Sequence, residues 1–137
     1  MSLVVDASMT IAWLFHDERS SLTQTVLRIV AAEGALVPSL WRLEVANVLR
    51  NAVRRGRCDD DYAARSLRRL SRLRITVDGE TDRHAWGATR ELSREYALTV
   101  YDAAYLELSL RRQQALASRD AALLTAARQI GLDVLGD

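Results

Sequence analysis

Short β-like runs, most of them apolar, alternate with longer segments of helical periodicity, and this alternation constrains the fold more than any other feature. The runs with strand character are Leu3–Val5, Ala35–Val37, Ile75–Val77, Ala115–Ala117 and, as an edge strand, residues 132–135. Strands that alternate with helices form parallel sheets covered by helices on both faces. The sequence therefore predicts a three-layer α/β/α domain with a mostly parallel central sheet.

The segments between these runs carry helix start and stop residues. Ser39 is expected to cap a helix that runs to Arg55 and stops at Gly56. The other expected helices cover residues 8–15, 20–33, from 59 or 60 to 73, from 81 or 82 to 96, 102–112 and 120–131. In open parallel sheets, ligands bind at the carboxyl ends of the strands, so the residues after each strand are the first candidates for a site.

Length and composition favour a single domain over residues 1–137. The chain shows no linker and no internal repeat, and it has one cysteine, Cys58, which excludes an internal disulfide. No apolar run approaches the roughly 18–20 residues that cross a bilayer. Asp6 interrupts the apolar N-terminus, which has no basic region, so we expect no signal peptide and a cytoplasmic protein.

All nineteen basic residues are arginine, and they are unevenly distributed. Residues 42–74 contain ten arginines and four acids. Such a segment can present a basic surface to a polyanion, whereas a solvated helical face explains the same composition. Both interpretations stay open at this point.

Three aspartates stand beside predicted strands or at helix starts. Asp6 follows Leu3–Val5 directly, Asp120 follows Ala115–Ala117 closely, and Asp102 stands before a helix that is apolar nearly all round. Each of them could instead cap its helix, because aspartate is a favoured N-cap residue.

Glu44 lies in the helix after Pro38 and flanks its apolar stripe, beside Trp41 and Val48. A glutamate in mid-helix has no capping role, and a partly buried carboxylate must be protonated, paired with a cation or bound to metal. An arginine partner is the alternative explanation. Four converging carboxylates repel one another, and a hard cation such as Mg²⁺ or Mn²⁺ relieves that repulsion. Such a site beside a basic surface suits phosphodiester hydrolysis.

Four segments resemble the PIN-domain family, specifically the VapC-type toxins of toxin–antitoxin pairs. In order, they are Val5-Asp6-Ala7-Ser8, LEVANVL (residues 43–49), YDAAYL (101–106) and ASRDAAL (117–123). The resemblance covers essentially the whole chain. It departs from the family's pattern at Ser118, where threonine is frequent; the hydroxyl is kept.

The resemblance implies a Mg²⁺- or Mn²⁺-dependent endoribonuclease that hydrolyses RNA phosphodiester bonds as the toxin of such a pair. Asp6 and Asp102 would be the main metal ligands, and Asp120 would complete the site directly or through water. Glu44 would orient or deprotonate the attacking water, or bind a second ion. Hydrogen-bonding support would come from Ser8, Asn47 and Ser118. The resemblance also implies a homodimer and a VapB-type antitoxin, joined in a heterotetramer or larger assembly.

Other enzyme classes fit the sequence less well. Receiver domains and haloacid-dehalogenase-type phosphatases share an aspartate after the first strand but use a lysine, which this chain lacks. Ser8 with His16 or His84 lacks a nucleophile-elbow pattern, and both histidines are better explained as surface or capping residues. The remaining alternative is a PIN fold that binds RNA or a partner without catalysis.

Two further expectations concern binding surfaces. Trp13, Leu14 and Phe15 are expected to help form a partner groove, because three successive large apolar residues cannot all face one core; burial among neighbouring helices is the alternative. Three arginines are expected to help bind RNA: Arg54, Arg55 and Arg57.

Overall fold

The computed structural model describes residues 3–136 and arranges five strands in one sheet, in the order β3-β2-β1-β4-β5. These are β1 (Leu3–Val5), β2 (Ala35–Val37), β3 (Ile75–Val77), β4 (Ala115–Ala117) and β5 (Val134–Leu135). Every neighbouring pair is parallel, which confirms the predicted sheet. The three inner strands are completely buried, and this explains why their sequences are apolar at every position.

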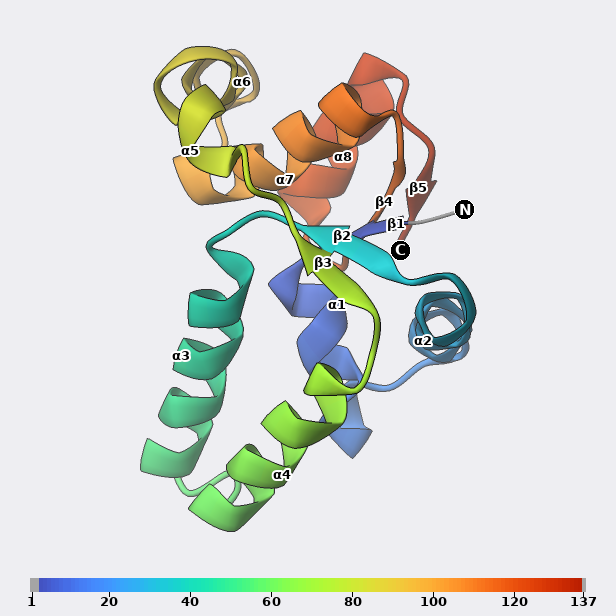
Figure 1. Cartoon of the computed structure of the whole chain (residues 1–137), viewed down its shortest axis with the longest axis vertical. Helices are drawn as coiled ribbons and strands as arrows, with labels where there is room; N and C mark the ends of the chain where they lie inside the picture. The colour runs from blue at the N-terminus through green and yellow to red at the C-terminus, as the bar shows by residue number, and fades with distance from the viewer. Residues whose placement is uncertain (1–2, 137) are drawn as a thin grey trace.

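Helices cover both faces of the sheet (Figure 1). Below it in that view lie α1 (Ala7–Ala12), α2 (Ser21–Glu33), α3 (Trp41–Arg54) and α4 (Asp60–Ser71). Above it lie α5 (Thr81–His84), α6 (Arg90–Tyr96), α7 (Val100–Arg112) and α8 (Ala121–Ile130). The predicted three-layer α/β/α architecture is therefore correct. None of the helices in residues 3–136 is both long and apolar enough to cross a membrane.

Several helix boundaries differ from the sequence prediction. Helix α7 begins at Val100 with Thr99 as its N-cap, so Asp102 lies inside its first turn. Helix α3 begins at Trp41 without a side-chain cap; Ser39 does not cap it, and the Ser39 amide instead donates to the Thr81 hydroxyl.

Two expected continuous helices are interrupted. The helix expected over residues 8–15 ends at Ala12 and is followed by a short 3₁₀ turn, η1 (His16–Glu18). The helix expected up to Tyr96 is divided by the wide turn η2 (Ala85–Thr89). Gly87 has φ −108° and ψ −106° there, a non-helical conformation that is easier for a residue without a Cβ atom.

The sheet order locates the crevice where ligands bind in such folds. From β1 the chain adds β2 and β3 on one side, and it later adds β4 and β5 on the other. The direction of winding thus reverses at the β1–β4 pair, and the carboxyl ends of these two strands lead directly to Asp6 and Ser118.

Candidate active site

Asp6 connects the loops that follow β1 and β4. Its side chain is almost completely buried, and its Oδ1 accepts a hydrogen bond from the Met9 amide at 2.9 Å, which caps α1. The Ser8 hydroxyl donates to Oδ1 at 2.7 Å, and the Ser118 hydroxyl donates to Oδ2 at 2.5 Å. The structure thus brings both predicted serines to this carboxylate, where they fix its orientation.

Asp120 and Asp102 lie at the starts of two other helices but differ in their local roles. Asp120 caps α8 by accepting a hydrogen bond from the Leu123 amide at 2.8 Å. Asp102 is not a cap, because Thr99 accepts the hydrogen bond from the Asp102 amide at 3.0 Å. The capping interpretation is therefore right for Asp6 and Asp120, and wrong for Asp102.

Glu44 is half-buried and lies in the first turn of α3, not in mid-helix as expected. Its partner is a residue that the sequence interpretation gave no role: the Tyr105 hydroxyl donates to Glu44 Oε1 at 2.5 Å. Among residues 3–136, no arginine forms an ion pair with Glu44, so the expected alternative of an arginine partner is wrong. The sequence feature that could have identified Tyr105 as a site residue is its position three residues after Asp102, on the same face of α7.

The four carboxylates influence one another electrostatically. Asp102 interacts with each of the other three, and Asp6 also interacts with Glu44. Burial raises the pKa of Asp6, of Glu44 and of Asp102 above the ordinary range for these residues. The charge of Asp102 raises the pKa of Asp6 and Glu44 further, and the charge of Asp120 does the same for Asp102. The carboxylates are therefore close enough for their charges to repel one another.

The donor set suits a hard cation, although the carboxylates do not form a closed cage. Among the described residues, no three His, Cys, Asp or Glu side chains are arranged so that together they could hold a metal ion. Magnesium, however, keeps several water ligands in proteins and is held by one or two carboxylates together with substrate phosphates. Mutually repelling carboxylates with raised pKa values, such as Asp6 and Asp102, fit that mode of binding.

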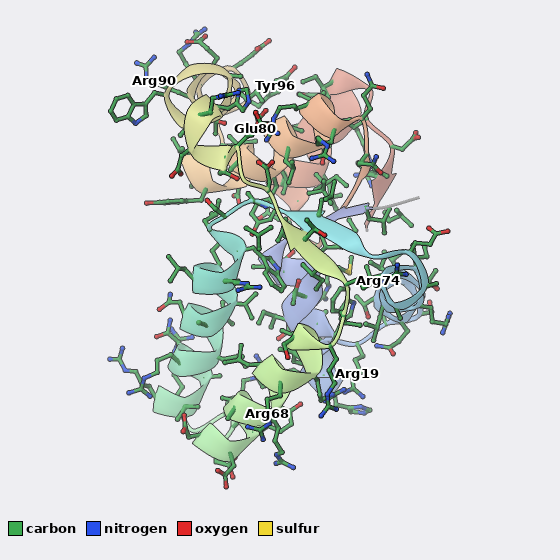
Figure 2. The ribbon with its side chains drawn as sticks, in the orientation of Figure 1. Arg19, Arg68, Arg74, Glu80, Arg90 and Tyr96 are labelled. Carbon is green, nitrogen blue, oxygen red and sulfur yellow. The ribbon has the colours of Figure 1, made fainter. Side chains whose placement is uncertain are left out.

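Among the described residues, the other predicted site residues form no side-chain hydrogen bond or ion pair with the four carboxylates. The side chain of Asn47 is exposed and makes no hydrogen bond with the described residues. Arg54 and Arg55 are exposed at the far end of α3, about 15 Å along the helix axis from Glu44 at the usual rise per residue. Arg68 of α4 lies at the surface as well (Figure 2).

Arg57 differs from its neighbours because it already has partners. Its guanidinium pairs with Asp17 and Glu18, each at 2.8 Å, and lies 3.8 Å above the centre of the Phe15 ring. An RNA phosphate would have to compete with both acids for this side chain.

The expected exposed groove at Trp13, Leu14 and Phe15 is wrong for this chain, because all three side chains are buried. The chain leaves the helix after Ala12, so the side chains turn toward different neighbours. The Trp13 indole donates to the Thr23 carbonyl oxygen at 3.0 Å, and the Phe15 ring packs against Tyr62. Burial among neighbouring helices, the alternative interpretation, is what the structure shows.

Comparison with known proteins identifies the family to which this fold belongs. A family model described as the PIN domain matches residues 3–129. Ribonuclease VapC9 of Mycobacterium tuberculosis is 33% identical over 121 residues, which are 86% of this chain and 85% of the relative. Ribonuclease VapC3 of Pyrobaculum aerophilum is 34% identical over 113 residues, 80% of this chain and 82% of the relative. The solved structure of PAE2754 from Pyrobaculum aerophilum superposes with a TM-score of 0.72 at 25% identity, covering 98% of this chain and 91% of that one. The chain therefore belongs to the PIN-domain family, with VapC ribonucleases among its relatives.

Proposed function

We propose that this protein is a Mg²⁺- or Mn²⁺-dependent endoribonuclease that acts as the toxin of a toxin–antitoxin pair. The observation that carries the proposal is the cluster of mutually repelling carboxylates, Asp6, Glu44, Asp102 and Asp120, at the winding reversal of the sheet. The ribonuclease names of its relatives support RNA as the substrate. The toxin role, a VapB-type antitoxin and a homodimer belong to the proposal through the resemblance to VapC proteins.

Each residue has a distinct task in this proposal. Asp6, oriented by Ser8 and Ser118, holds the ion together with Asp102, and Asp120 completes the site directly or through water. When bound, the ion supplies a water of lowered pKa and stabilises the charge that develops on the phosphate. Glu44 orients the attacking water or takes its proton. Arg54 and Arg55 are proposed to contact the RNA backbone. If they do, RNA binding by their alanine variants should depend less on salt concentration than binding by wild type.

The experiment uses purified protein freed of any antitoxin and end-labelled RNA, with Mg²⁺, with Mn²⁺ and with excess chelator. Wild type is expected to cleave only with metal, and Asp6→Asn is expected to lose cleavage. Asp59→Asn is the matched control: Asp59 is an exposed N-cap of α4, outside the cluster, and this variant should stay active. Equal cleavage by Asp6→Asn and wild type would contradict the proposal. RNA binding without cleavage would favour the non-catalytic binding module.

A further inference from the structure

Glu44 and Tyr105 come from helices on opposite faces of the sheet. In Figure 1, α3 lies below the sheet and α7 above it. The hydroxyl of Tyr105 reaches Glu44 Oε1 at 2.5 Å, around the carboxyl edge of the strands. Within residues 3–136, no other hydrogen bond joins these two helices. The hydrogen bond from Trp41 to Thr10 holds the backbone of α3 near Asp6. Among the described residues, however, the Glu44 carboxylate has only the Tyr105 hydroxyl to orient it.

Tyr105 is well suited to hold another side chain in place. It is 1% exposed, within a stretch of α7 that is buried without interruption from Ala103 to Ser109. It lies three residues after Asp102, on the same face of the helix. A partner of Tyr105 is thereby held at a defined distance from Asp102.

Glu44, in contrast, needs to be held. Its side chain is half-buried, and the charges of Asp102 and Asp6 repel it. Without a donor at Oε1, the carboxylate would turn toward solvent, where that repulsion is weaker. Its Oε2 makes no hydrogen bond with the described residues and stays available to a further group.

We propose that Tyr105 is a positioning residue: its hydroxyl holds Glu44 Oε1 against the repulsion of Asp6 and Asp102, so that Oε2 orients the attacking water. This inference rests on the proposed ribonuclease function. Orientation of a reacting group contributes strongly to rate, and a carboxylate that rotates freely loses that contribution.

Tyr105→Phe tests the role, because it removes the hydroxyl and keeps the ring. The variant's kcat for RNA cleavage is expected to fall about 10- to 100-fold, as for other groups that orient a catalytic residue, with KM unchanged. Binding of Mn²⁺ alone, followed by calorimetry, should also be unchanged, because Asp6 and Asp102 remain. Tyr62→Phe is the matched control: its hydroxyl donates to the Leu14 carbonyl oxygen, away from the cluster, so kcat should not change.

Comparison with the Glu44→Gln background separates positioning from general damage. If Tyr105 acts through Glu44, Tyr105→Phe causes no further loss of kcat in that background. A fall of the same size in both backgrounds, or loss of Mn²⁺ binding, would overturn the role. The role would also be overturned if wild type is active and Tyr105→Phe cleaves RNA with the same kcat. Absence of metal-dependent cleavage by wild type would instead contradict the proposed function itself.

Discussion

In the proposed function, single residues of this fold combine a structural task with a chemical one. Asp6 and Asp120 each use Oδ1 to cap a helix, and an N-cap needs only one of the two carboxylate oxygens. Asp120 Oδ2 makes no hydrogen bond with the described residues, so it can face a cation or water. The two tasks are therefore compatible within one side chain, and substitutions can separate them.

Asp120 allows this separation to be measured. Asparagine keeps a cap of similar quality but lacks the charge, so Asp120→Asn should preserve the free energy of unfolding and lose RNA cleavage. Asp120→Ala should lose cleavage and also about 1 kcal/mol of stability, the usual cost of an absent cap. Urea denaturation and cleavage assays on both variants test this. Wild-type cleavage by Asp120→Asn would exclude a role for the charge.

Helix α7 connects the candidate site with the opposite end of the upper layer. Asp102 and Tyr105 stand near its start, and Arg111 stands at its end. The Arg111 guanidinium donates to Asp78 Oδ2 at 2.6 Å and to Glu107 Oε2 at 2.8 Å. Because Asp78 follows β3 and is buried, this network attaches α7 to the sheet's edge.

Removing Arg111 should destabilise the fold strongly. Arg111→Ala leaves the buried carboxylates of Asp78 and Glu107 without their cation, and breaking a buried ion pair in this way costs about 3–5 kcal/mol. The neighbouring Arg112 is exposed, and its side chain makes no ion pair with the described residues, so Arg112→Ala is the control. A small effect of Arg111→Ala on the urea midpoint would show that the network contributes little.

The same network predicts a dependence of stability on acid pH. Burial tends to raise the pKa of Asp78, but hydrogen bonds from Arg111 and Thr81 outweigh it and hold that pKa below its ordinary value. The ionised form is thus favoured in the fold. Its stabilisation is complete above an ordinary aspartate pKa of about 3.9 and is lost as pH falls through the lowered value. The difference in free energy of unfolding between wild type and Arg111→Ala should therefore shrink below about pH 4, as urea titrations at several pH values would show.

At the scale of the whole molecule, the doubly wound sheet brings four acids from distant segments to one edge. Loops after β1 and β4 contribute Asp6 and Asp120, while α3 and α7 contribute Glu44 and Asp102. The repulsion among their charges opposes folding, and a cation bound between them would reduce it.

Metal should therefore stabilise the folded protein. A cation that binds only the folded state adds about 2.7 kcal/mol at a concentration 100 times its dissociation constant. Thermal unfolding with increasing Mn²⁺ should show a rising Tm, reversed by chelator. The shift should disappear in Asp102→Asn and persist in Asp59→Asn. An unchanged Tm in wild type would contradict a metal site formed by this cluster.

The sequence alone determined the strands and the layer order, and it singled out the four acids on which the proposed function rests. β1, β2 and β4 lie where their apolar runs predicted, because a strand buried on both faces is apolar at every position. The edge strand β3 also lies at the predicted residues, although its central Thr76 is exposed. The acids could be selected because they stand beside strands or on an apolar stripe, which is local information. The general rule that ligands bind at the carboxyl ends of parallel strands then directed attention to the loops that contain these acids.

Only the tertiary structure decided how these elements meet. The contact between Tyr105 and Glu44 joins residues 61 positions apart, and burial of Trp13, Leu14 and Phe15 depends on where the chain turns after Ala12. Local periodicity shows which face of a helix is apolar, but not which side chain of another layer will reach it. The four carboxylates remain the centre of the proposal, and the structure adds the buried hydroxyl that holds one of them in place.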